Sequence, residues 1–483
     1  MLKDILEVFN KNLEKYGEEY ILKDYGLSDG TYVIVSKNGS IKAQIEIVKG
    51  DILGDKNIKE ELMDEIKFYD YHSKILSTNK SIDSHKLIHS NSYLSFILKK
   101  DSLKRGKLKD EYIGEYYEAL KYPEKRFSKY KDTKALYLNV EKEFGKPDID
   151  EIEAKKTWMV NNLHSIKYLE GNNYLKIFFE ETKEKYVEEY NKYLIPRIYV
   201  SNTHNVSING LAHGIPVNNM TINRNKPYLL NNTKKIQAPY LVSVEAAVLE
   251  NKFFDYLSML ASDGKRNIYI DQLTNEIIAV PMGEAPDLIM SGYFLKVVKD
   301  KELKIVDQEN ISNYRNKLKE PFTYNEIFKI NYDMFSKADI KMSKDMDSQL
   351  YTKYEKRTDI GRLIDVVFFS GCLRSTFNQE IFTNTNSFLK KTILQNRDAI
   401  FDSIYKGYNN GPQFLGKNAA EIIEFNVENG NFIQAVRQLN LKYSLKSYMS
   451  MKDNGEEFTE ESIASRETTK LILEFLRSKW VIL

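Results

Sequence analysis

Cysteine is almost absent from this sequence, in which Cys372 is the single thiol. One cysteine excludes an intrachain disulfide, and it also excludes a zinc site built from the usual two to four thiolates. Cys372 lies in the apolar run VVFFSGCLR, where a free cysteine is typical of a small core residue rather than a nucleophile. No feature of the sequence therefore indicates thiol chemistry.

Long hydrophobic runs are missing as well. No window reaches the roughly 18 uncharged apolar residues that a membrane-spanning helix needs. The N-terminal segment MLKDILEVFNKNLEKYG interleaves acids with apolar residues, which is typical of an amphipathic helix and not of a signal peptide. The sequence predicts a cytoplasmic protein with no membrane partner.

The overall composition is that of a folded globular protein. Hydrophobic residues make up 42% and charged residues 29% of the 483 residues, which excludes disordered and collagen-like classes. A chain of this length predicts two or three domains. The net charge is only +2, so the distribution of charge along the chain, not its sum, must indicate the partners.

Residues 1–320 have the pattern of an α+β region with several hairpins. The β-rich segment 30–48 is interrupted by Asn38 and Gly39, which is a strong short-range hairpin signal. Further strand-like runs span 91–100, 266–282 and 291–307. Helical patterns lie between these runs, so we predict a first domain of mixed α+β structure.

From Pro321 onward the alternating pattern gives way to helical spacing, which predicts an all-α helical-bundle domain over residues 321–483. The clearest helix covers 386–406, where one apolar stripe is formed by Phe388, Leu389, Ile393, Ile400, Phe401 and Ile404. Other helices are expected near 351–376, 418–429, 431–447 and 460–478. Gly430 and Asn431 have the chemistry of a helix stop followed by an N-cap. A bundle starting near residue 340 is long enough to be expected to fold by itself.

Acidic residues are absent from one long stretch, residues 191–244, where about eight would be expected at the average frequency of the chain. The same stretch carries six basic residues, nine Asn between 202 and 232, and four interleaved Tyr. Phosphates favour Lys, Arg and neutral donors without competing carboxylates, while Asn can bind base edges and Tyr can stack. The stretch therefore predicts nucleic-acid contact, although long loops that use Asn and Gly in turns would show the same composition.

Two other sets of basic residues add to this prediction. Segment 97–112 holds Lys99, Lys100 and Arg105 among few acids. Lys390, Lys391 and Arg397 lie largely off the apolar stripe of the predicted helix 386–406. Short basic runs are usually solvated surface, so these residues are candidates only in combination with the acid-free stretch.

Recognisable catalytic motifs do not occur in the sequence. It has no GxxxxGK[ST] phosphate loop, no GxSxG elbow and no HExxH pair. His85 and His89 are spaced like two ligands on a helix but have no carboxylate partner in the pattern. Asp271 and Glu276 flank a predicted hairpin and are the acids that a metal-dependent nuclease might recruit. We predict a protein without enzymatic activity, metal or other cofactor.

Three segments together resemble a known family. They are HSNSYLSFILKKDSL at 89–103, HGIPVNNMTINRNKPYLLNNTKKIQAPYLVSVEAAV at 213–248, and FFDYLSMLASDGKRNIYI at 253–270. The pattern is similar to that of the large subunit of the subtype I-B CRISPR surveillance complex, Cascade. The matching positions are Gly214, Pro216, Asn218, Asn219, Met220, Asn223, Lys226, Pro227, Tyr228, Leu229, Asn231, Thr233, Lys234 and Lys235. Many relatives carry paired cysteines upstream, and this sequence has none.

The resemblance implies a non-catalytic subunit of a ribonucleoprotein complex in antiviral defence. Such a subunit helps to hold crRNA, inspects the protospacer-adjacent motif on double-stranded target DNA, favours R-loop formation and supports recruitment of a helicase-nuclease. Its other partners are the backbone, handle-binding and small subunits of Cascade. Guide pairing supplies most sequence specificity in such complexes, so a short motif and the backbone are all that the subunit must read. The expected contact residues are Asn218, Asn219, Asn223, Arg224, Lys226, Lys234, Lys235, Lys99, Lys100, Arg105, Lys390, Lys391 and Arg397.

Two alternatives remain open at the level of sequence. A metal-dependent nuclease acting on RNA or DNA would cut nucleic acid with Mg²⁺ or Mn²⁺. A scaffold that contacts only protein would bind no nucleic acid. The resemblance also suggests that the C-terminal part could be made separately as a small subunit, for which Met342 and Met346 are candidate internal starts.

Overall fold

We describe the chain from a computed structural model. It covers residues 1–53, 60–127, 131–167, 171–201, 204–218, 240–300, 302–336, 352–375, 386–408, 417–453 and 467–482. The chain forms two compact units, an N-terminal unit of residues 2–263 with 299–304 and a C-terminal unit of residues 264–298 and 305–483. The two units divide after Asp263, whereas Pro321, where the sequence predicts a boundary, lies inside strand β12 (Lys317–Thr323).

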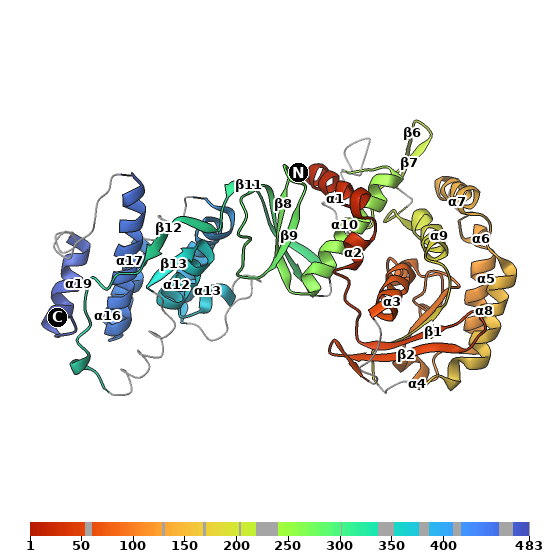
Figure 1. The fold of residues 1–483 in the computed structure, drawn as a ribbon, viewed down its shortest axis with the longest axis horizontal. Coiled ribbons are helices and arrows are strands. Elements are labelled where there is room, and N and C mark those ends of the chain that lie inside the picture. Colours follow the sequence, from red (N-terminus) through yellow and green to blue (C-terminus); the bar gives the residue numbers. More distant parts are fainter. Residues whose placement is uncertain are drawn as a thin grey trace. The chain divides into compact units, whose positions relative to one another are not determined.

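A five-stranded sheet organises the N-terminal unit (Figure 1). Its strands are β1 (Gly30–Val35), β2 (Ile41–Val48), β3 (Asp51–Leu53), β4 (Ser95–Lys99) and β5 (Tyr174–Phe179), in the order β3-β2-β1-β5-β4. All pairs are antiparallel except β1 and β5, which are parallel. The predicted hairpin at 30–48 is confirmed, and Gly39 takes the positive φ of 86° that its turn requires.

Helices surround this sheet, and a small hairpin follows them. The α-helices are α1 (Leu2–Tyr16), α2 (Glu19–Leu22), α3 (Glu60–Ser73), α4 (Lys100–Lys104), α5 (Asp110–Lys121), α6 (Glu124–Phe127), α7 (Lys131–Phe144), α8 (Ile149–Asn162), α9 (Lys183–Leu194) and α10 (Val244–Ser262). Short 3₁₀ turns are η1 (Thr78–Lys80), η2 (Leu163–Ser165) and η3 (Ile195–Arg197). The hairpin is formed by β6 (Val206–Ile208) and β7 (Leu211–His213). The α+β prediction for this part of the chain is confirmed.

The two faces of the large sheet are covered by different helices, because successive side chains of a strand point in opposite directions. On one face Phe178 of β5 packs against Tyr69 of α3, with ring centroids 6.1 Å apart. On the other face Phe96 of β4 packs edge-on against Tyr116 of α5 at 6.0 Å. Both faces are buried, which explains the continuous apolar run of β1.

One ion pair is buried beneath α3. Lys176 of β5 places its Nζ 2.8 Å from both carboxylate oxygens of Asp70 on α3. The Tyr25 hydroxyl donates to the same carboxylate at 3.0 Å. Asp70 is 3% exposed and Lys176 is 8% exposed, so the two charges depend on each other for solvation.

The C-terminal unit contains a four-stranded sheet and a set of helices (Figure 1). The sheet strands are β8 (Lys265–Asp271), β9 (Ile277–Pro281), β10 (Met290–Lys299) and β11 (Leu303–Tyr314), in the order β11-β10-β8-β9. The predicted strands at 266–282 and 291–307 are confirmed. A second, two-stranded sheet pairs β12 with β13 (Lys353–Lys356).

The helices of this unit are α12 (Arg357–Phe369), α13 (Cys372–Ser375), α14 (Ser387–Phe401), α16 (Lys417–Glu428), α17 (Phe432–Asp453) and α19 (Glu467–Ser478). The π-helix η8 (Asp402–Lys406) extends α14, and the 3₁₀ turn η6 (Tyr332–Met334) precedes β13. The stripe predicted on 386–406 faces the core, with Ile393 and Ile400 at most 2% exposed. Gly430, with φ 75°, separates α16 from α17 as predicted.

The C-terminal region is mainly helical but is not all-α, because β13 and the end of β12 belong to it. Its core also continues into the four-stranded sheet, where Tyr269 and Tyr314 stack at 5.4 Å. Their hydroxyls donate to the backbone carbonyls of Tyr405 and Ile404. The bundle predicted from residue 340 therefore shares its core with strands that precede it. Met342 and Met346 lie outside the described residues.

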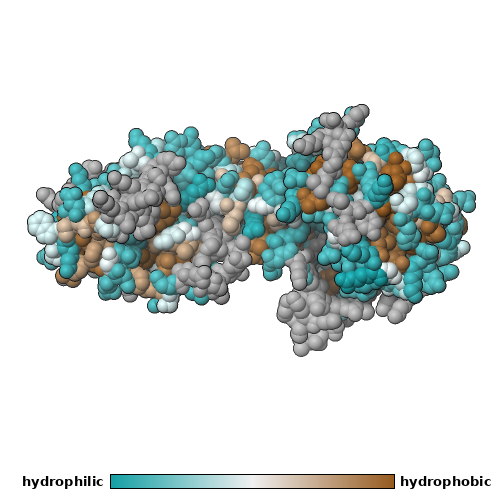
Figure 2. Space-filling view, turned by 90° about the horizontal axis from the view of Figure 1, so that it is seen from below, coloured by the Kyte–Doolittle hydropathy of each residue, from teal (hydrophilic) through white to brown (hydrophobic). Residues whose placement is uncertain are grey.

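The surface is mostly polar. On the face shown in Figure 2, hydrophilic residues predominate and hydrophobic residues form smaller areas between them. Within the described ranges, no helix is both long enough and apolar enough to cross a membrane.

Candidate nucleic-acid interface

The acid-free stretch enters and leaves the N-terminal unit at one place. Gly214 and Val242 form an antiparallel bridge, with their backbone N–H and carbonyl groups paired at 3.0 and 3.1 Å. Gly214 lies before residues 219–239 and Val242 lies after them. The structure thus brings the two ends of the segment 219–239 together on the surface of the unit.

The carboxylate of Glu250 on α10 holds both ends. The Nδ2 of Asn218 donates to Glu250 Oε1 at 3.3 Å, and the Tyr240 hydroxyl donates to Glu250 Oε2 at 3.1 Å. Next to them, Asn251 Nδ2 donates to the carbonyl of Val217 at 2.9 Å. We call this group, Asn218, Tyr240, Glu250 and Asn251, the clamp.

Tyr199 fills the space beneath the clamp. Its hydroxyl lies within hydrogen-bond distance of the carbonyls of Ala212 and Val242, at 2.8 and 3.0 Å. A Cβ atom on Gly214 would lie 2.6 Å from the Tyr199 ring, so glycine is required at this position of the matching motif. The base of the segment is therefore a packed structure, and not a freely hinged pair of strands.

Burial sets the charge behaviour of the clamp. Glu250 is 1% exposed, and this burial raises the pKa of its carboxyl, although the hydrogen bonds from Tyr240 and Asn218 act in the opposite direction. α10 begins next to the clamp, where Ser243 Oγ accepts from the N–H of Ala246 as an N-cap.

Most of the predicted contact residues of this stretch cannot be placed. Asn219, Asn223, Arg224, Lys226, Lys234 and Lys235 lie outside the described residues. Asn218 is described, and it is 7% exposed and bound to Glu250. Its amide therefore supports the base of the segment in this structure, which is the supporting alternative to direct reading of a base edge.

The second predicted set is divided by the structure. Lys99 at the end of β4 is exposed, and so is Arg105, which pairs with Asp101 at 2.7 Å. Lys100 between them is 1% exposed, and its ammonium pairs with Glu46 of β2 at 2.5 Å. Lys100 points into the protein because β2 offers it a buried carboxylate, so it is not part of the proposed interface.

The third set lies on α14 in the C-terminal unit. Lys391 is exposed, while Lys390 and Arg397 are half-buried. Arg397 also contacts the neighbouring Asp398 at 3.3 Å. These residues keep a solvent-facing side, so they stay candidates for a contact separate from the acid-free stretch.

The rejected catalytic candidates have structural partners. His85 stacks on Tyr112 and pairs with Glu115 at 2.9 Å, and His89 lies 3.1 Å from the Lys86 carbonyl. Asp271 accepts from three backbone N–H groups at the β8–β9 turn. In the part of the chain that the structure describes, no group of three or more His, Cys, Asp or Glu could hold a metal ion.

Sequence reasoning missed Glu250 and did not single out Arg197. Glu250 is one acid in the apolar helix pattern VEAAVLENKFF, and only its burial reveals its function. A signal was available, since an acid on the apolar face of a helix next to an acid-free stretch needs hydrogen-bond donors. Arg197 was counted among the basic residues, but nothing in its neighbours along the chain indicates that it is buried.

Removing the clamp carboxylate gives a direct test of this geometry. Glu250→Ala deprives Tyr240 and Asn218 of an acceptor, which we expect to cost about 1–3 kcal/mol. Trypsin should then cleave faster after Arg224, Lys234 and Lys235, as followed by mass spectrometry of the fragments. Glu245→Ala, an exposed position on the same helix, is the matched control. Equal cleavage rates in the two variants would contradict the clamp.

Searches with this chain found no matching protein-family model, no matching curated protein and no matching solved structure.

Proposed function

We propose that this chain is the non-catalytic large subunit of a type I-B CRISPR Cascade complex. In this proposal it acts in the cytoplasm, binds crRNA and double-stranded target DNA, and recognises the protospacer-adjacent motif. It also promotes R-loop formation and helps to recruit a helicase-nuclease. The observation that carries the proposal is the motif at 213–248, which resembles that family and lies in a stretch of 54 residues without a carboxylate.

The geometry of the clamp supports this proposal. The motif residues Gly214 and Asn218 build the base of segment 219–239, and the following motif α10 supplies Glu250. Two of the three resembling segments thus meet in one structure. Arg224, Lys226, Lys234 and Lys235 are linked to this base without any acid between them, as phosphate binding requires.

The proposal is tested by reconstitution. The chain is co-expressed with the other Cascade subunits and a crRNA, and the complex is purified through a tag on this chain. We expect the other subunits and the crRNA to co-purify, and the complex to bind duplex DNA with the cognate motif more tightly than DNA with a changed motif. A difference of about 1–3 kcal/mol is expected for each lost base contact.

Other outcomes would identify a different protein class. Purification of this chain without subunits or crRNA would refute membership of the complex. Cleavage of RNA or DNA by the purified chain with Mg²⁺ or Mn²⁺, lost on carboxylate substitution, would favour the nuclease. Failure to retard any nucleic acid in a gel would favour a protein scaffold.

A further inference from the structure

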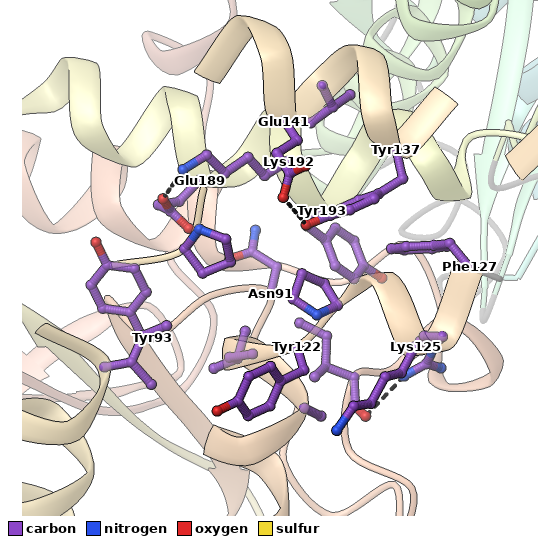
Figure 3. A pocket seen from close by; sticks show the side chains of 18 of the residues that line it. Asn91, Tyr93, Tyr122, Lys125, Phe127, Tyr137, Glu141, Glu189, Lys192 and Tyr193 are labelled. Carbon is purple, nitrogen blue, oxygen red and sulfur yellow. Dashed lines mark hydrogen bonds and ion pairs between the residues drawn. The ribbon is translucent and has the colours of Figure 1, made fainter. Parts of the chain in front are cut away.

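A pocket of about 360 Å³ lies in the N-terminal unit, among α5, α6, α7, α9 and the turn η3 (Figure 3). Aromatic side chains dominate its wall. Figure 3 shows the rings of Tyr93, Tyr122, Phe127, Tyr137 and Tyr193 arranged around it. Such a wall can stack with a planar ligand, and the volume is that of a small-molecule site.

Arg197 is the buried cation of this pocket. Its residue is 9% exposed, and its guanidinium lies 4.8 Å from the Phe127 ring centre and 4.5 Å from that of Tyr193. Nη1 donates to the Tyr193 carbonyl at 2.9 Å. The Nε–H finds no acceptor among the described residues, although it is buried. A buried donor without an acceptor is costly, and a ligand would relieve that cost.

Two further cations lie near Arg197. Arg126, which is exposed and also lines the pocket, donates to the carbonyls of Ile82 and Ser81 at 2.9 and 2.5 Å. Lys80 donates to the Tyr199 carbonyl at 2.6 Å. Burial and the charges of Arg197 and Arg126 lower the pKa of Lys80 to about 8. Within the described ranges, no carboxylate pairs with any of these three cations.

The acids that line the pocket are engaged elsewhere. Glu189 pairs with Lys192 at 2.8 Å, and Glu118 pairs with Lys121 at 2.6 Å. Glu141 accepts from the Tyr137 hydroxyl at 3.1 Å. None of them neutralises Arg197, so the positive charge at the base of the pocket has no counter-charge from the protein.

We propose that this pocket binds one nucleotide, with its base against the aromatic wall and its phosphate on Arg197 and Arg126. A phosphate accepts several charge-assisted hydrogen bonds from guanidinium groups, and an aromatic ring stacks with any base. A ligand with only one of these features would leave either the wall or the cations unused. The proposal goes beyond the proposed function, since it does not depend on membership of Cascade.

The test uses the full-length chain without other subunits or crRNA. Binding of adenosine 5′-monophosphate, adenosine and inorganic phosphate is measured by calorimetry and by the shift in melting temperature. We expect the nucleotide to bind more tightly than either part. A short oligonucleotide with a 5′-phosphate and the same strand with a 5′-hydroxyl distinguish a free nucleotide from a strand as its source.

Three variants separate binding from folding. Arg197→Met keeps the volume and removes the buried charge, so nucleotide affinity should fall by about tenfold to hundredfold while the melting temperature is unchanged or higher. Arg126→Gln and Tyr122→Ala change exposed residues and should weaken phosphate binding and base stacking, respectively. Both remain informative if Arg197→Met does not fold. Arg105→Gln, an exposed position outside the pocket, is the control and should bind as the unaltered chain does.

The proposal is overturned if adenosine 5′-monophosphate and both oligonucleotides fail to bind. It is also overturned if Arg126→Gln and Tyr122→Ala bind the nucleotide as tightly as the unaltered chain. Equal affinity for inorganic phosphate and for the nucleotide would reduce the pocket to a plain anion site and would equally refute it. Binding of the strand but not of the free nucleotide would support it and identify the source.

Discussion

Replacing Arg224, Lys226, Lys234 and Lys235 together by glutamate is expected to flatten the salt dependence of nucleic-acid binding. Each lost phosphate contact lowers the slope of log affinity against log salt by about one unit. Loss of four contacts would therefore reduce the advantage of the unaltered chain about a hundredfold between 50 and 200 mM salt. The measurement is a salt titration of duplex DNA and crRNA binding by fluorescence anisotropy.

A matched variant controls for net charge. Lys3, Lys11, Lys15 and Lys183 are exposed in the same unit, and their replacement by glutamate changes the net charge by the same amount. This control should keep the slope of the unaltered chain if the contacts are local. An unchanged slope in the folded Arg224/Lys226/Lys234/Lys235 variant would remove the acid-free stretch from the interface.

Asp70→Asn is expected to be the most destabilising single substitution that we consider. It leaves the Lys176 ammonium buried without its carboxylate, and breaking a buried pair in this way costs about 3–5 kcal/mol. Burial alone would lower the pKa of Lys176, but the charge of Asp70 outweighs it and raises that pKa above 10.5. The pair therefore stabilises the unaltered protein at all pH values below 10.5, and this contribution is lost only above it.

The pH dependence of the variant gives a sharper test. Without Asp70, burial should bring the folded-state pKa of Lys176 below its unfolded value of 10.5. The folded state then binds fewer protons than the unfolded state, so the free energy of unfolding of Asp70→Asn should rise as pH increases toward 10.5. The unaltered chain should lack this rise.

The chain provides its own probe for this measurement. Trp158 packs edge-on against Phe179 in the N-terminal unit, and Trp480 is the other tryptophan of the sequence. In a Trp480→Phe background, the fluorescence of Trp158 reports urea unfolding of the N-terminal unit. Asp70→Asn with Lys176→Met should regain most of the lost stability. Glu188→Gln, at a surface pair 3.5 Å from Lys185, is the control. A loss below about 1 kcal/mol for Asp70→Asn would contradict the assigned function of the pair.

Local patterns were sufficient to predict most elements of secondary structure. The hairpin around Asn38 and Gly39 depends on two adjacent residues, and the stripe of α14 depends on the periodicity of one helix. The stop at Gly430 requires only a positive φ at one position. Each of these features is encoded within a few residues, so the sequence by itself determined them.

Which long-range partners meet was decided by the tertiary structure alone. Lys100 and Lys99 are neighbours with the same charge, yet Lys100 is buried because Glu46, 54 residues earlier, lies opposite it on β2. Asn218 supports the clamp because α10 brings Glu250 to it. Arg197 enters the pocket because η3 follows α9, and its burial comes from rings on α6 and α9. Composition identifies an acid-free, basic stretch, but burial and charge pairing depend on residues far apart in sequence, and only folding brings these together.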